Sequence, residues 1–124
     1  MYRVTPDQAE KELTISYRGH VTPEETRLCD EEVKLALARL EPGFRLIVDL
    51  TGLELMELGC SPRVAAIMEH CDAAGVAEVV RIIPDPTRDI GLQILSLFHY
   101  GSDVCIRTCA SVAEANELQS LEQV

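Results

Sequence analysis

Residues 44–56 read FRLIVDLTGLELM, and this stretch decides the fold. Within it, residues 46–50 (LIVDL) form an apolar run that only Asp49 interrupts. The run lies between Pro42-Gly43 and Thr51-Gly52, and a short apolar run bounded by turn residues is typical of a strand buried on both faces. We therefore expect an interior strand over residues 46–50, in a sheet with helices on both sides.

Length and charge limit the classes of protein to consider. A chain of 124 residues fits one domain, which we expect to span residues 1–124. The formal net charge of −10 argues against nucleic acid or an anionic membrane as a partner. No apolar run approaches the roughly 18–20 residues that a membrane-spanning helix needs, so we expect no membrane insertion.

The N-terminal residues and the cysteines indicate a location. The segment MYRVTPDQAEKELT is too polar for a secretory signal. Five cysteines are an odd number without paired spacing, which favours reduced thiols. We therefore expect a cytoplasmic protein.

The residues before the interior strand predict two strands and a helix. Residues 2–4 suit a short edge strand, and Leu13, Ile15 and Tyr17 alternate with polar residues until Gly19. A capping box over residues 22–25 (TPEE) then starts a helix. Its expected apolar stripe is Cys29, Val33, Ala36, Leu37 and Leu40, and its expected solvated face is Glu24, Arg27, Asp30, Glu31, Lys34 and Arg39.

The residues after the interior strand alternate between helix and strand. Ser61-Pro62 predicts a capped helix that Gly75 ends, and residues 76–84 (VAEVVRIIP) predict a strand. A third helix is expected over residues 85–101, a short strand around 104–106, and a fourth helix from residue 111. The predicted fold is therefore α/β, with a mixed, mostly parallel sheet of four to five strands and about four helices.

This order of elements, together with residues 46–56, resembles a STAS domain, the module of sulfate transporters and bacterial anti-sigma factor antagonists. LIVDLTGLELM is similar to the family's strand of the form hhhDLSGhxxh (h apolar), with Asp49, Leu50 and Gly52 corresponding position by position. The resemblance implies that the loop after this strand is the regulatory site. In the family an Asp-Ser-Ser-Gly motif carries the serine that a partner kinase phosphorylates there.

This chain departs from that motif. The four positions hold Glu57, Leu58, Gly59 and Cys60, so an acidic residue is kept but neither serine is. The nearest hydroxyl is Ser61. Either a shifted loop makes Ser61 the phosphoacceptor, or the domain works without phosphorylation.

Ser61 supports two interpretations. A phosphate at a helix N-terminus meets free amides and the positive end of the helix dipole, and Arg63 in the same turn could pair with it. Alternatively, Ser61 only caps the helix, a common role that stabilises it by about 1 kcal/mol.

No catalytic arrangement can be argued from spacing. The three histidines (His20, His70 and His99) do not converge with a nucleophile, and no glycine-rich phosphate loop is present. Asp49 is expected to accept N–H bonds from the turn that follows it. We therefore expect a protein that is not an enzyme and holds no cofactor or metal.

Two classes of function remain. The first is a regulatory or protein-interaction module that acts through the loop before the second helix, with a partner of the kinase or anti-sigma type or a transporter component. The second is a domain that binds a small ligand, either a nucleotide or a lipid-like molecule, with Arg63 and Arg81 supplying positive charge. An accessory subunit of a transporter is a further alternative. The loop residues singled out are Glu57, Leu58, Gly59, Cys60, Ser61 and Arg63.

The third helix suggests self-association. Its main stripe is expected to fill the core, while Leu92, Leu95 and His99 fall on the opposite side, with Tyr100 beside them. A helix that is apolar on both faces is usually buried on both, which predicts a homodimer through this face. The alternative is that the N-terminal segment or a loop covers Leu92 and Leu95.

Overall fold

The computed structural model describes residues 1–83, 104–109 and 113. The elements follow one another in this order: β1 (Tyr2–Asp7), β2 (Glu12–Val21), α1 (Pro23–Leu37), β3 (Arg45–Met56), the 3-10 helix η1 (Leu58–Cys60), α2 (Ser61–Ala73), β4 (Glu78–Ile82) and β5 (Cys105–Cys109). The predicted third and fourth helices, and with them Leu92, Leu95, His99 and Tyr100, lie outside the described residues.

The described strands form one mixed sheet in the order β1-β2-β3-β4-β5. β1 pairs antiparallel with β2, and β2 to β5 are parallel to their neighbours. The predicted α/β class and mostly parallel sheet are therefore confirmed. β3 occupies the central position, as its apolar run predicts.

β3 is longer than the sequence indicated, because it continues beyond Leu50 to Met56. β2 also continues past Gly19, whose φ of 61° accompanies shifts in the register with β3. Those shifts let Val21 pair with Met56, so both strands keep a hydrogen-bonding partner to their ends. The predicted ends at Leu50 and Gly19 were therefore wrong.

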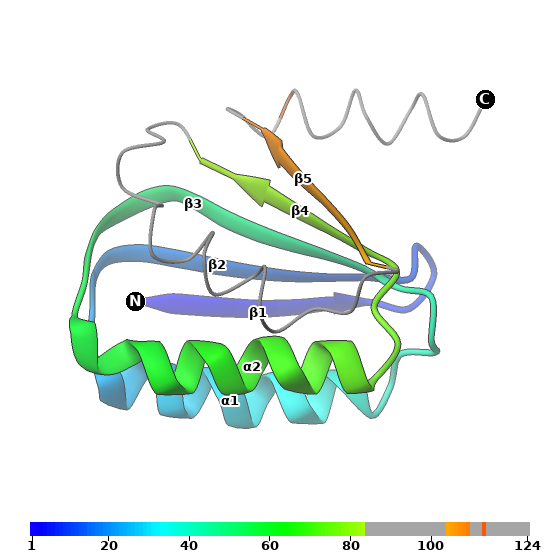
Figure 1. The fold of residues 1–124 in the computed structure, drawn as a ribbon, viewed down its shortest axis with the longest axis horizontal. Coiled ribbons are helices and arrows are strands. Elements are labelled where there is room, and N and C mark those ends of the chain that lie inside the picture. The colour runs from blue at the N-terminus through cyan, green and yellow to red at the C-terminus, as the bar shows by residue number, and fades with distance from the viewer. Residues whose placement is uncertain (84–103, 110–112, 114–124) are drawn as a thin grey trace.

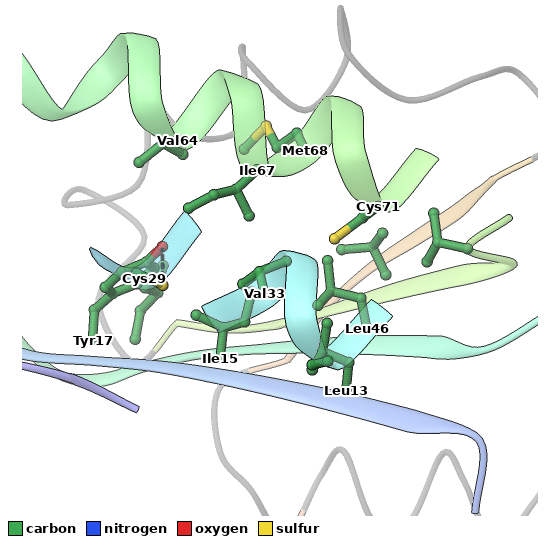
Figure 2. Close-up of a cluster of buried hydrophobic side chains, with 14 of the residues drawn as sticks. Leu13, Ile15, Tyr17, Cys29, Val33, Leu46, Val64, Ile67, Met68 and Cys71 are labelled. Carbon is green, nitrogen blue, oxygen red and sulfur yellow. Dashed lines mark hydrogen bonds between the residues drawn. The ribbon is translucent and has the colours of Figure 1, made fainter. Parts of the chain in front are cut away.

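α1 and α2 lie side by side on one face of the sheet (Figure 1). The core is the layer between these two helices and the sheet. Figure 2 shows its side chains pointing toward one another from the strands and from both helices. The alternation in β2 produces this layer, because every second residue faces the helices. The core residues from these elements include Leu13, Ile15, Tyr17, Cys29, Val33, Leu46, Val64, Ile67, Met68 and Cys71.

The opposite face of the sheet holds a smaller buried cluster of Val80, Ile82 and Cys109, with Ile47 packed against it. Ile47 is only half-buried, whereas Leu46 and Leu50 on the helix side are buried. Val48 on the helix side is also only half-buried, so the prediction that the β3 run is buried on both faces is confirmed in full only for Leu46 and Leu50, on the helix side. Both described α-helices cover that side.

No helix within the described ranges has the length and apolar character needed to cross a bilayer.

Candidate functional site

The loop between β3 and α2 packs against the corner between β2 and α1. The backbone N–H of Glu57 donates to the carbonyl of Val21 at 3.2 Å, and the thiol of Cys60 donates to the same carbonyl at 3.5 Å. A Cβ atom on Gly59 would lie 3.0 Å from Cγ of Pro23, so the loop backbone approaches this corner closely. The parallel pairing of β2 with β3 brings these two connections to one end of the sheet.

Leu58 forms the tip of this loop. Its side chain is 91% exposed, and that of Leu55, at the end of β3, is 54% exposed. The turn around Leu58 is closed by hydrogen bonds from Cys60 N–H to the Glu57 carbonyl at 2.9 Å and from Ser61 N–H to the Leu58 carbonyl. A large apolar side chain is thus held in solvent by a turn whose own backbone is bonded.

Cys60 anchors the loop and is not a candidate nucleophile. It is fully buried, and burial raises the pKa of its thiol above the ordinary value. A thiol attacks as its thiolate, so a raised pKa keeps the reactive form scarce near neutral pH. Its bond to Val21 instead fastens the loop to β2.

Ser61 does not cap α2, so the capping interpretation was wrong. The residue at the cap position is Cys60, in a helical conformation, and no side chain makes a capping hydrogen bond there. η1 runs directly into α2, which moves Ser61 one position into the helix. Ser61 is exposed at the first residue of α2.

Arg63 does not point toward Ser61. Its guanidinium lies 3.6 Å from Asp30 of α1, because residues two apart in a helix face different directions. Asp30 was predicted on the solvated face of α1 but is only 1% exposed. Its Oδ1 also lies 2.8 Å from Nδ1 of His70 of α2, and its Oδ2 lies 3.8 Å from Nζ of Lys34, so Asp30 links the two helices.

His20 is a site residue that sequence reasoning missed. Its Nε2 lies 2.8 Å from a carboxylate oxygen of Glu57, although the two residues are 37 positions apart. The pairing of His20 with Leu55 places it beside the loop. No spacing in the sequence signals this contact, because it depends on the register of two parallel strands.

Asp49 has the structural role that was predicted. Its carboxylate accepts the backbone N–H of Thr51 at 3.0 Å and the Thr51 hydroxyl at 2.7 Å. Gly52 pairs with Arg18 of β2, and a Cβ atom at Gly52 would lie 3.0 Å from Cγ of Arg18. The Asp-Leu-Thr-Gly stretch is therefore explained by local packing in β3 and needs no catalytic role.

A cavity of about 30 Å³ lies between the sheet and α2. That volume is too small for a nucleotide. Arg81 lines this cavity and is 2% exposed, whereas Arg63 contacts Asp30, so the described structure does not favour the predicted pair of ligand-binding arginines. Among the described residues, no group of His, Cys, Asp and Glu is arranged to hold a metal ion.

Three solved structures share this architecture across nearly their whole length. The anti-sigma factor antagonist SpoIIAA in its unphosphorylated form has a TM-score of 0.66 and 12% identity, with 100% of both chains covered. The phosphorylated form of the Bacillus cell fate determinant SpoIIAA has a TM-score of 0.63 and 15% identity, covering 96% of this chain and 99% of that chain. The chain has a SpoIIAA-like fold.

The third structure is an uncharacterized protein of the DUF3478 family from Shewanella loihica PV-4, itself described as SpoIIAA-like. It has a TM-score of 0.72 and 14% identity, covering 94% of this chain and 92% of that chain. No protein-family profile matches this sequence, and no curated protein matches it. The STAS-type resemblance of residues 46–56 is thus confirmed at the level of the SpoIIAA-like fold.

Proposed function

We propose that this chain is a non-enzymatic regulatory module that binds a protein partner through the loop of residues 57–61. The observation that carries the proposal is Leu58, whose side chain is 91% exposed on a turn fastened to Val21 and Pro23. Because the backbone of this turn is already hydrogen-bonded, little further backbone ordering is needed when the Leu58 side chain enters a partner's pocket. His20 and Glu57, whose Nε2 and carboxylate oxygen lie 2.8 Å apart, supply polar groups beside it, as at the rim of a protein interface.

The similar structures support this proposal without naming a partner. Two of them are SpoIIAA, described as an anti-sigma factor antagonist and a cell fate determinant, in unphosphorylated and phosphorylated forms. By analogy, the partner of this chain is a protein of the kinase or anti-sigma type, or a transporter component. Because the analogy rests on the fold alone, the identity of the partner depends on the residues of the loop.

The binding test uses a matched pair of leucines. Tagged wild-type protein should capture its partner from the source cell, and Leu58→Asp should abolish capture, because a carboxylate at the tip opposes burial. Leu35→Asp is the control, since Leu35 is 71% exposed on α1 and lies outside the loop. Capture that is equal for wild type and Leu58→Asp would remove the loop from the interface. A small molecule that co-purifies in native mass spectrometry would favour the ligand-binding alternative.

Ser61 is the proposed phosphoacceptor of the module. It is exposed at the first residue of α2, where a phosphate gains from the positive end of the helix dipole. A cognate serine kinase should therefore add one phosphate that Ser61→Ala abolishes. Equal labelling of wild type and Ser61→Ala would exclude this residue and leave a module that works without phosphorylation.

A further inference from the structure

β1 forms one edge of the described sheet, and its outer side carries backbone groups that β2 does not use. Met1 and Arg18 exchange hydrogen bonds at 3.0 and 2.7 Å, which fixes the alternation of the antiparallel pair. Arg3, paired with Ser16, therefore bonds to β2, while the backbone groups of Tyr2, Val4 and Pro6 point outward.

A groove runs along this edge on the helix side of the sheet. It has a volume of about 230 Å³ and lies between β1 and α1. Val4 and Pro6 line it from the strand, and Leu35 and Ala36 line it from the helix. Leu35 is largely exposed, so this edge presents apolar surface next to backbone donors and acceptors that no other described residue uses.

The edge is balanced in charge although the chain as a whole carries −10. Arg3 and Asp7 lie on the face of β1 away from α1, and Glu32 and Arg39 line the groove. A net charge of this size repels a second copy from most of the surface. Two copies of the chain can therefore approach each other most easily along the β1 edge, where positive and negative side chains alternate.

We propose that β1 pairs antiparallel with β1 of a second copy, with Val4 opposite Val4 at the two-fold axis. Val4 of each copy would donate to and accept from Val4 of the other, and Tyr2 N–H would donate to the Pro6 carbonyl of the second copy. This register sets Arg3 directly opposite Thr5 of the second copy, so that Asp7 and Arg3 of that copy are its two diagonal neighbours on the outer face. A register shifted by one pair would set Arg3 opposite Arg3.

Pro6 limits the strength of this pairing. Proline has no N–H, so the Pro6 position accepts from the second copy without donating to it. Proline at an outward position of an edge strand also blocks further strand addition at that end. The pairing therefore favours a reversible dimer with a closed two-fold arrangement.

The test measures the mass of the protein in solution by light scattering over a range of concentrations. Wild type should approach twice 13.7 kDa. Val4→Pro removes the central donor without touching a bond to β2, and should be monomeric with an unchanged circular dichroism spectrum. Pro6→Thr supplies the missing N–H and should lower the dissociation constant.

A charge exchange tests the register with variants that leave the core untouched. Arg3→Asp should raise the dissociation constant about tenfold, because two attractive diagonal pairs become repulsive. The double variant Arg3→Asp/Asp7→Arg should restore it. A monomeric wild type would overturn the proposal, and so would a dimer that Val4→Pro and Arg3→Asp leave unchanged. A dimer that only Leu92→Glu/Leu95→Glu dissociates would assign the interface to the predicted third helix.

Discussion

Asp30 shows at the scale of one residue how the tertiary structure changes the meaning of a charge. In the sequence it belongs to a run of charged residues on one side of α1. In the structure it is buried, and His70, Arg63 and Lys34 surround its carboxylate. A buried carboxylate is tolerated when cations and hydrogen bonds replace the water it has lost.

We predict that Asp30 and His70 are energetically coupled. Asp30→Asn should lower the free energy of unfolding by about 1–2 kcal/mol, a value reduced because His70 is partly exposed. His70→Ala and the double variant complete a thermodynamic cycle, measured by urea unfolding. The expected coupling is about 1 kcal/mol. Additive effects of the two substitutions would show that the contact contributes nothing.

Two buried thiols predict how stability depends on alkaline pH. Burial raises the pKa of Cys29 to about 11 and that of Cys71 to about 12, from an ordinary value of 9.0. Above pH 9 the unfolded chain loses these protons before the folded chain does. The folded state then binds more protons, so the free energy of unfolding falls as pH rises, whereas below pH 9 it is unaffected by these groups.

The expected loss is about 1.4 kcal/mol per pH unit for each thiol between pH 9 and 11. Urea unfolding at pH 7 to 11 measures it. Cys29→Ala/Cys71→Ala should be less stable at pH 7, because it leaves cavities, but should lose less stability than wild type above pH 9. Parallel curves for the two proteins would contradict the assignment to these thiols.

At the scale of elements, the two described α-helices begin in different ways. α1 follows its predicted capping box, because the Thr22 hydroxyl accepts the N–H of Glu25 at 3.3 Å. α2 has a similar pattern in sequence, with Ser61-Pro62 in place of Thr22-Pro23, but η1 precedes it and supplies backbone bonds instead. The same residue types therefore differ in energetic role according to the connection that comes before them.

We predict that Thr22→Ala lowers the free energy of unfolding by about 1 kcal/mol and Ser61→Ala by less than about 0.5 kcal/mol. Ser61→Asp should stabilise the protein by about 0.3–1 kcal/mol through the helix dipole, and salt should weaken this gain. Thermal or urea unfolding of the three variants measures these effects. A loss for Ser61→Ala as large as that for Thr22→Ala would restore the capping role.

At the scale of the whole molecule, the order β1-β2-β3-β4-β5 places β3 at the centre of the described sheet, with a strand on each side, and α1 and α2 cover one face of that sheet. The backbone hydrogen bonds of β3 can break only when β3 separates from a neighbouring strand. β1 has one strand neighbour among the described elements, and most of its residues are exposed. Local opening should therefore be easier at β1 than at β3.

We predict that hydrogen exchange is slowest for the amides of Leu46 to Leu50 and clearly faster for Arg3 and Thr5, which bond to β2 at the edge. Exchange followed by nuclear magnetic resonance at low protein concentration measures this order. Protection of Arg3 and Thr5 equal to that of β3 would contradict an edge position for β1.

The sequence by itself predicted the order of the described strands, the interior place of β3, the start of α1 and the role of Asp49, and it left the number of strands at four to five. These features depend on local patterns, since periodicity, caps and turn residues act within a few positions along the chain. The apolar run of residues 46–50 predicted an interior strand because only a central position gives such a run enough burial.

Only the tertiary structure decided which distant residues meet. His20 reaches Glu57 because β2 and β3 run parallel and shift register near Gly19, and Asp30 is buried because α2 packs against α1 on the same face of the sheet. Ser61 lies inside α2 because η1 runs directly into that helix, and the Cys60 thiol of η1 donates to the carbonyl of Val21 on β2. Such contacts depend on strand register and helix packing, which short-range sequence patterns do not encode.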